Sequence, residues 1–146
     1  MKNKTILISP VGGQAIIGFI KYFKKKGFII IGVDHDKDAI GKYFINYFYQ
    51  IDKIGSKKYF KQVIDIINKH KIDIFISWLD SELSCWNDYF LKNKSNKKIK
   101  KIFAFNFADD LYKFQDKLKF YKLLKENNFL SPETHILTNE TTKNKL

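Results

Sequence analysis

Apolar residues near the amino terminus first form a continuous run and then recur at helical spacing. Thr5 to Ser9 is a short β-branched and apolar run, which Pro10 and the pair Gly12-Gly13 bring to an end. The apolar residues beyond the glycines lie three or four positions apart, as on one face of a helix: Ile16, Ile17, Ile20 and Phe23. This pattern predicts a strand, a glycine turn and a helix.

The next residues predict the end of that helix and a second strand. Lys24 to Lys26 suit the negative end of a helix dipole, and Gly27 suits the position after the last helical turn. Phe28 to Val33 is apolar without alternation, which is typical of a strand covered on both faces. We therefore expect a right-handed βαβ unit in a parallel sheet.

The remainder of the chain continues to alternate between short apolar runs and helical periodicity. In chain order we expect a strand over Tyr47 to Ile51, a helix around Phe60 to Ile67, a strand over Ile72 to Ser77, a helix over Glu82 to Lys92, a charged loop over Lys92 to Lys101, a strand over Ile102 to Phe105, a helix from Asp109 or Asp110 to Asn127-Asn128, and an extended piece over His135 to Thr138. This order predicts an α/β fold, an open and doubly wound, mostly parallel sheet with helices on both faces.

Composition and charge narrow the choice of partner. The chain has 146 residues, of which 45% are hydrophobic, and its formal net charge is +12. Such a charge favours nucleic acid or an anionic surface, but every basic residue is Lys, and Arg is the side chain that reads guanine edges and clamps phosphates. Specific nucleic-acid recognition is therefore disfavoured, and a lysine-rich interaction module remains an alternative.

Two observations bear on the compartment. Apolar runs are much shorter than the roughly 18 to 20 residues that cross a bilayer, and Pro10 with Gly12-Gly13 interrupts the only stretch that resembles a signal peptide. Cys85 is the only cysteine, which excludes an internal disulfide and a thiolate cage for zinc. We expect a cytoplasmic chain without a membrane span, in which Cys85 is a structural thiol.

In open α/β sheets, ligands bind beyond the carboxyl ends of the strands, where Gly12, Gly13 and Asp34 are expected to lie. The glycines permit close backbone approach, and the helix after them offers N–H groups to an anion. Asp34 follows the turn by about 20 residues, as does the ribose-binding acid of dinucleotide folds. The spacing with Gly18 does not satisfy G-x-G-x-x-G, so a purely structural turn and a free-standing dinucleotide module both stay open. Within the helix, Gly18 is expected to allow close helix–sheet packing.

Two further acids follow a strand directly. Asp80 and Glu82 flank Ser81, so one of them can receive a substrate ammonium or hydroxyl, or the pair can cap the following helix. No metal site is predicted. Asp34 to Asp38 resembles a calcium loop, but Ala39 stands where an EF-hand needs Gly and Ile45 where it needs Glu.

Several segments together resemble one family, the amino-terminal or pre-ATP-grasp domain of ligases similar to the large subunit of carbamoyl-phosphate synthase. The collinear segments are Ile6-Leu7-Ile8 with Gly12-Gly13-Gln14-Ala15 and Gly18, Ile31 to Asp36 with Ala39 and Gly41, Ile72-Asp73 with Asp80 to Leu83, and Asp116-Lys117 with Leu123 to Asn127 and Ser131 to Thr134. Asn128 replaces a glycine of the family pattern, which is a mild change because Asn also adopts the left-handed conformation.

The resemblance implies an enzyme that activates a carboxylate as an acyl phosphate with ATP and Mg²⁺ and joins it to an amine. It implies a pre-ATP-grasp domain over residues 1–112 and a segment over 113–146 that leads into ATP-grasp lobes absent from this chain. We therefore expect a piece of a longer protein that has no ligase activity and no firmly bound cofactor of its own. Gly12, Gly13, Gln14, Asp34, Asp80 and Glu82 are the expected contacts to a small-molecule carboxylate or amine substrate, and no residue is assigned a catalytic role.

An aromatic stretch suggests a further contact. The side chains of Tyr43, Phe44, Tyr47, Phe48 and Tyr49 exceed what one short strand buries. We expect part of this surface to meet the absent lobes or a second subunit, as in a homodimer.

Overall fold

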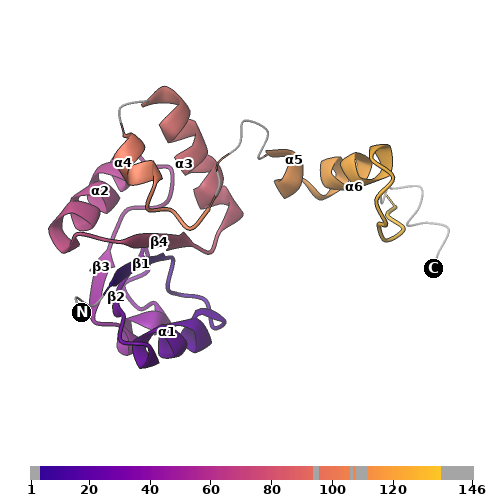
Figure 1. The fold of residues 1–146 in the computed structure, drawn as a ribbon. Helices are drawn as coiled ribbons and strands as arrows, with labels where there is room; N and C mark the ends of the chain where they lie inside the picture. The colour runs from indigo at the N-terminus through magenta and orange to yellow at the C-terminus, as the bar shows by residue number, and fades with distance from the viewer. Residues whose placement is uncertain (1–3, 94–95, 106, 108–111, 136–146) are drawn as a thin grey trace. The chain divides into compact units, whose positions relative to one another are not determined.

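The computed structural model describes residues 4–93, 96–105, 107 and 112–135 (Figure 1). Its elements are β1 (Thr5–Ser9), α1 (Ile16–Lys25), β2 (Ile29–Asp34), the 3₁₀ helix η1 (Ile40–Phe44), β3 (Tyr47–Gln50), α2 (Tyr59–His70), β4 (Ile74–Ser77), α3 (Asp80–Lys92), α4 (Lys97–Lys100), α5 (Tyr112–Gln115) and α6 (Lys117–Glu126). They fall into two units, residues 1–108 and 109–146.

The first unit is built on a parallel sheet with strand order β3-β2-β1-β4. In the register of the central strand, Ile8 lies opposite Gly32 of β2 on one side and Ile76 of β4 on the other. The chain moves outward from β1 to β2 and β3 and then returns to place β4 on the other side of β1. All four carboxyl ends therefore lie at one edge of the sheet. The strand order reverses between β1 and β4, because strands before this point are added on one side of β1 and β4 on the other, as expected for a doubly wound sheet.

Helices cover both faces of this sheet (Figure 1). On one face α1 contributes Ile16 and Ile20, which pack with Ile6, Ile8 and Ile30 of the strands. On the other face, residues of α2 and α3 form a larger and more aromatic cluster with the strands; its buried members include Leu7, Ile31, Tyr59, Val63, Phe75, Trp86 and Phe90. This packing on both faces explains why the apolar runs of the strands do not alternate with polar residues, because neighbouring residues of one strand enter different cores. The predicted α/β class is confirmed.

Several predicted boundaries are confirmed and others are wrong. Gly27 follows α1 with a φ of +81°, as its predicted capping role requires. Asp80 does not cap α3, because it is the first helical residue and Leu79 takes the capping position. The predicted charged loop contains the short helix α4.

The predicted strand over Ile102 to Phe105 is wrong as well, since this segment makes one isolated bridge, from Phe103 to Phe75. Phe75 donates to the Ile102 carbonyl at 2.7 Å and accepts from the Ala104 amide at 2.9 Å. The turn that closes α4 directly precedes this segment, and the Phe103 ring lies in the core against Trp86. Pairing therefore does not extend beyond one residue.

In the second unit the predicted long helix is divided. α5 ends at Gln115 and α6 begins after Asp116, whose carboxylate accepts hydrogen bonds from the amides of Leu118 and Lys119, both at 3.0 Å. Asn128 has a φ of +58°, which confirms that Asn serves in the left-handed position after the helix. The predicted helix start at Asp109 or Asp110, the end of the extended piece at Thr138 and the tail lie outside the described residues.

No helix in the described part of the chain is both long and apolar enough to cross a bilayer.

Candidate functional site

A cleft of about 550 Å³ lies at the carboxyl edge of the sheet. The loops after β1, β2 and β3 line it, and the residues with bearing on its chemistry are Gly12, Gly13, Asp34, His35, Asp36, Asp52 and Lys53. The structure thus brings Gly12, Gly13 and Asp34 together, as the sequence predicts. Gln14, Asp80 and Glu82 are not among the described residues that line this cleft.

Asp34 joins the loops that follow β1 and β2. Its Oδ2 accepts a hydrogen bond from the Gly12 amide at 2.7 Å, and its Oδ1 accepts one from the Asp36 amide at 3.0 Å. The Nδ1 of His35 lies 3.2 Å from the same Oδ1. Asp34 is buried, and both carboxylate oxygens are already used within the protein. A backbone N–H of the glycine turn is therefore bound by this carboxylate instead of facing a ligand anion.

Glycine is needed at position 12 because the Asp34 carboxylate lies close to its backbone. Gly12 and Gly13 do not have positive φ, whereas a Cβ added at Gly12 would lie 3.0 Å from Oδ2 of Asp34. At Gly13 an added Cβ would meet nothing within 4 Å. The same holds at Gly18, so the expected role of Gly18 in close helix–sheet packing is wrong, because this residue lies on the exposed side of α1.

Gly41 is a glycine whose role sequence reasoning did not explain. A Cβ at this position would overlap the backbone carbonyl oxygen of Val11, which accepts a hydrogen bond of 2.9 Å from the Gly41 amide. The contact holds η1 against the loop that follows β1. Gly41 therefore supports the wall of the cleft from outside.

Glu82 is fully buried beneath the edge of the sheet. Its Oε1 accepts from the Ser9 hydroxyl at 2.6 Å and from the Tyr59 hydroxyl, and its Oε2 accepts from the Ser77 hydroxyl at 2.5 Å. The Tyr59 oxygen in turn accepts from Nε1 of Trp86 at 3.0 Å. One carboxyl group thereby connects β1, β4, α2 and α3 at the point where the strand order reverses.

Burial determines the electrostatics of this network. Desolvation raises the pKa of Glu82 despite the three hydroxyl donors, and Asp34 adds to the effect. Desolvation and the neighbouring Glu82 carboxyl likewise raise the pKa of Tyr59. Glu82 cannot contact a substrate in this conformation, so its role in the structure is to hold the ends of β1 and β4 together. The hydroxyl-bearing partners, Ser9, Tyr59 and Ser77, were not singled out in the sequence, since nothing in their spacing marks them.

The remaining candidate residues lie on the surface. Asp80 and Gln14 are exposed, the first at the start of α3 and the second before α1. Cys85 is half-buried, and burial raises the pKa of its thiol, which opposes a nucleophilic role. In the described ranges, no group of three or more metal-binding side chains comes together.

Charges in the cleft differ in sign from those of the chain as a whole. Asp36 and Asp52 lie on its lining together with buried Asp34, while Lys53 is the cation among the described lining residues, with His35 beside Asp34. A chain of net charge +12 thus carries a cleft in which carboxylates outnumber ammonium groups. Such a lining favours the cationic part of a small molecule.

The fold resembles that of solved synthetases and carboxylases. N5-carboxyaminoimidazole ribonucleotide synthetase from Thermotoga maritima is 19% identical with a TM-score of 0.59, over 90% of this chain and 32% of that chain. The corresponding synthetase from Staphylococcus aureus, complexed with ADP, is 20% identical with a TM-score of 0.60, over 86% and 31%. Pyruvate carboxylase from Rhizobium etli is 16% identical with a TM-score of 0.60, over 92% and 13%. The chain spans about a third or less of each of these proteins.

Sequence comparison gives the family. No curated protein matches the chain. Residues 6–102, about two thirds of the chain, match the family described as PylC-like, N-terminal domain. Together with the shared fold, this match confirms the resemblance to a pre-ATP-grasp domain. The chain belongs to the PylC-like N-terminal domain family.

Proposed function

We propose that this chain is the amino-terminal, substrate-side domain of an ATP-dependent ligase that activates a carboxylate as an acyl phosphate and joins it to an amine. The observation that carries the proposal is the cleft at the carboxyl edge, which Gly12 and Asp34 shape in a member of this family. Resemblance to carbamoyl-phosphate synthase supplies the reaction class, and the cleft supplies a place for substrate.

The described residues at the carboxyl edge of the sheet do not fit a nucleotide and magnesium site. Asp34 and the Gly12 amide are bound to each other, and the described residues hold no cluster of metal ligands. We therefore derive no step through ATP or Mg²⁺ here, and we assign their binding to ATP-grasp lobes in the full-length protein. The chain alone is expected to release no phosphate from ATP. The burial of Asp34, together with the hydrogen bonds that both its oxygens accept, also disfavours the alternative of a dinucleotide module, in which the corresponding acid binds the ribose.

The second unit carries exposed apolar side chains. Described residues of α6 include no buried one, and Phe114, Phe129 and Leu130 are exposed. A helix of this length is marginal in water without packing. These apolar side chains are therefore suited to be buried against the proposed ATP-grasp lobes.

The charge of the cleft points to the part of the substrate that it holds. Asp36 is exposed and Asp52 is half-buried at the lining, so a ligand ammonium would find carboxylate oxygens without displacing the Asp34 clamp. We assign the amino group of a small amine or amino-acid substrate to this position.

A matched set of amino acids tests the assignment. L-lysine, L-norleucine and L-glutamate are titrated into the ¹⁵N-labelled chain while backbone amide shifts are followed by NMR. We expect L-lysine, which carries a second ammonium, to shift the amides of Asp36 and Asp52 in a saturable manner, L-norleucine to shift them less, and L-glutamate, whose side-chain carboxylate is repelled, to shift them least. Asp36→Asn should weaken the response to L-lysine, while Asp88→Asn, on α3, serves as the control for lost charge. Equal responses to L-lysine and L-glutamate would contradict the assignment.

A further inference from the structure

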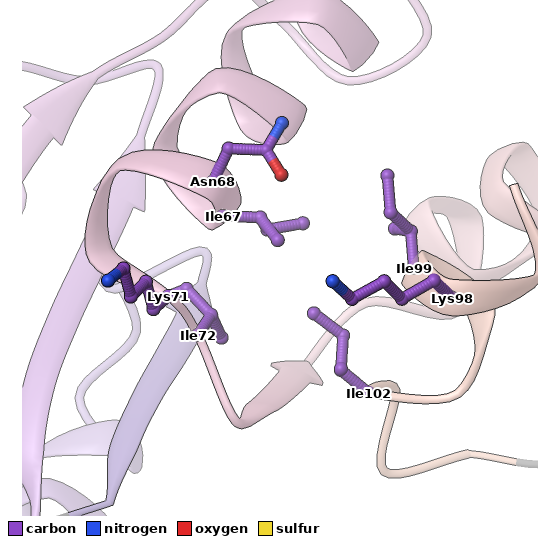
Figure 2. A pocket seen from close by; sticks show the side chains of 7 residues that line it. All are labelled: Ile67, Asn68, Lys71, Ile72, Lys98, Ile99 and Ile102. Atoms are coloured by element: carbon purple, nitrogen blue, oxygen red, sulfur yellow. The ribbon is translucent and has the colours of Figure 1, made fainter.

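A second cavity, of about 370 Å³, lies at the opposite edge of the sheet (Figure 2). It lies between the carboxyl-terminal end of α2, which ends at His70, and the segment around α4. Ile72, on its wall, precedes β4, so the cavity is at the amino edge of that strand. It is therefore separate from the cleft formed by Gly12 and Asp34, which lies at the carboxyl edge.

Aliphatic side chains from two segments line this cavity. Ile67 and Ile72 come from the α2 side and are buried, whereas Ile99 and Ile102 face them from the α4 side and are half-buried (Figure 2). Among the described residues of the lining, none is aromatic and none is acidic. Branched aliphatic walls without a ring to stack on favour a saturated chain over a flat heterocycle.

Polar groups at the cavity are cationic or amide. Figure 2 shows the side chain of Lys98 reaching from α4 toward α2, while the ammonium of Lys71 points away from the space between them. Asn68 places its carboxamide on the α2 side of the cavity. An ammonium beside an apolar interior is the arrangement that recognises an anionic group attached to an aliphatic body.

We propose that this cavity binds a small aliphatic carboxylate. Its hydrocarbon chain lies between the four isoleucines, and its carboxylate meets the ammonium of Lys98 and the amide of Asn68. The volume is near the lower end of ligand pockets, which limits the ligand to a short chain. This site does not depend on the function proposed for the carboxyl edge.

Four probes of related structure test the proposal on the full 146-residue chain. Hexanoate, hexylamine, 1-hexanol and acetate are each titrated against the ¹⁵N-labelled protein. Hexanoate should bind in the millimolar range, as a ligand of so few atoms permits, and should shift the amides of Ile67, Ile72 and Ile99. Hexanol should bind more weakly at the same residues, and acetate and hexylamine should not saturate. Saturation by hexylamine equal to that by hexanoate, or shifts confined to the Asp34 cleft, would overturn the proposal.

Two lysines of the same short helix give a matched pair of variants. Lys98→Gln should raise the Kd for hexanoate by about two- to fivefold, the range expected for an exposed charge pair. Lys97, on α4 but outside the lining of this cavity, provides the control, and Lys97→Gln should leave the Kd unchanged. Equal effects of the two substitutions would show attraction by the general positive charge and would overturn the assignment of Lys98.

Discussion

The carboxylate of Asp34 and the backbone amide of Gly12 are joined by a hydrogen bond of 2.7 Å. This bond links the loop after β1 to the end of β2, although the residues lie 22 positions apart. The sequence suggests Gly12 and Asp34 as contacts to a ligand, whereas in the structure they bind each other. The shape of the cleft depends on this pair.

Removing the carboxylate should destabilise the domain. In Asp34→Ala the amides of Gly12 and Asp36 lose their acceptor, and the free energy of unfolding should fall by about 1 to 3 kcal/mol. Urea denaturation measures the change. Asp36→Ala removes only the acceptor of the exposed Asp38 amide, a bond of 2.8 Å that water can replace, and should cost about 0.5 kcal/mol. Equal losses in the two variants would show that the clamp contributes nothing specific.

Adjacent glycines offer a second comparison. Gly12→Ala places a methyl group 3.0 Å from Oδ2 of Asp34, so the hydrogen bond must lengthen, and we expect a loss of about 1 kcal/mol. Gly13→Ala has free space around the new methyl group and should change stability by less than about 0.5 kcal/mol. Thermal unfolding of both variants under one set of conditions tests the order, and a reversed order would refute the close-approach argument.

The fold was largely predictable from local pattern, because each early strand and helix carries its own periodicity and punctuation. The structure near α4 could not be predicted in this way, because the bridge at Phe103 depends on ring packing against Phe75 and Trp86 from distant segments. The cleft was predictable at Gly12, Gly13 and Asp34 because parallel strands bring their carboxyl ends to one edge. The burial of Glu82 could not be predicted from the sequence, because its hydroxyl partners come from three separate elements. These partners are Ser9, Tyr59 and Ser77.

Glu82 should make stability depend on pH. Its folded-state pKa is raised, so the native state keeps the proton at pH values where the unfolded state has lost it. Stability from this group is complete below the ordinary Glu pKa and is lost as pH rises through the folded pKa. Glu82→Gln should therefore gain stability relative to the unsubstituted chain as pH rises from 4 to 8. Urea unfolding across this range measures the difference, and a difference that is constant or falls with pH would contradict the account.

Tyr59 should contribute through its hydroxyl. Tyr59→Phe removes a donor to buried Glu82 and the acceptor of Nε1 of Trp86, and we expect a loss of about 1 to 3 kcal/mol. Tyr89→Phe is the control, because the Tyr89 hydroxyl accepts from the partly exposed amide of Asn96 and its loss should cost less. Chemical denaturation compares the two, and a larger effect at Tyr89 would argue against the buried network.

The coding sequence downstream of Leu146 tests the central claim most directly, since the claim is that this domain serves a larger ligase. We predict that the reading frame continues into an ATP-grasp domain with lysine-bearing strands and paired acidic residues that hold ATP and magnesium. A stop codon directly after Leu146 would contradict the ligase assignment for this molecule and would leave ligand binding by the bare domain as its function.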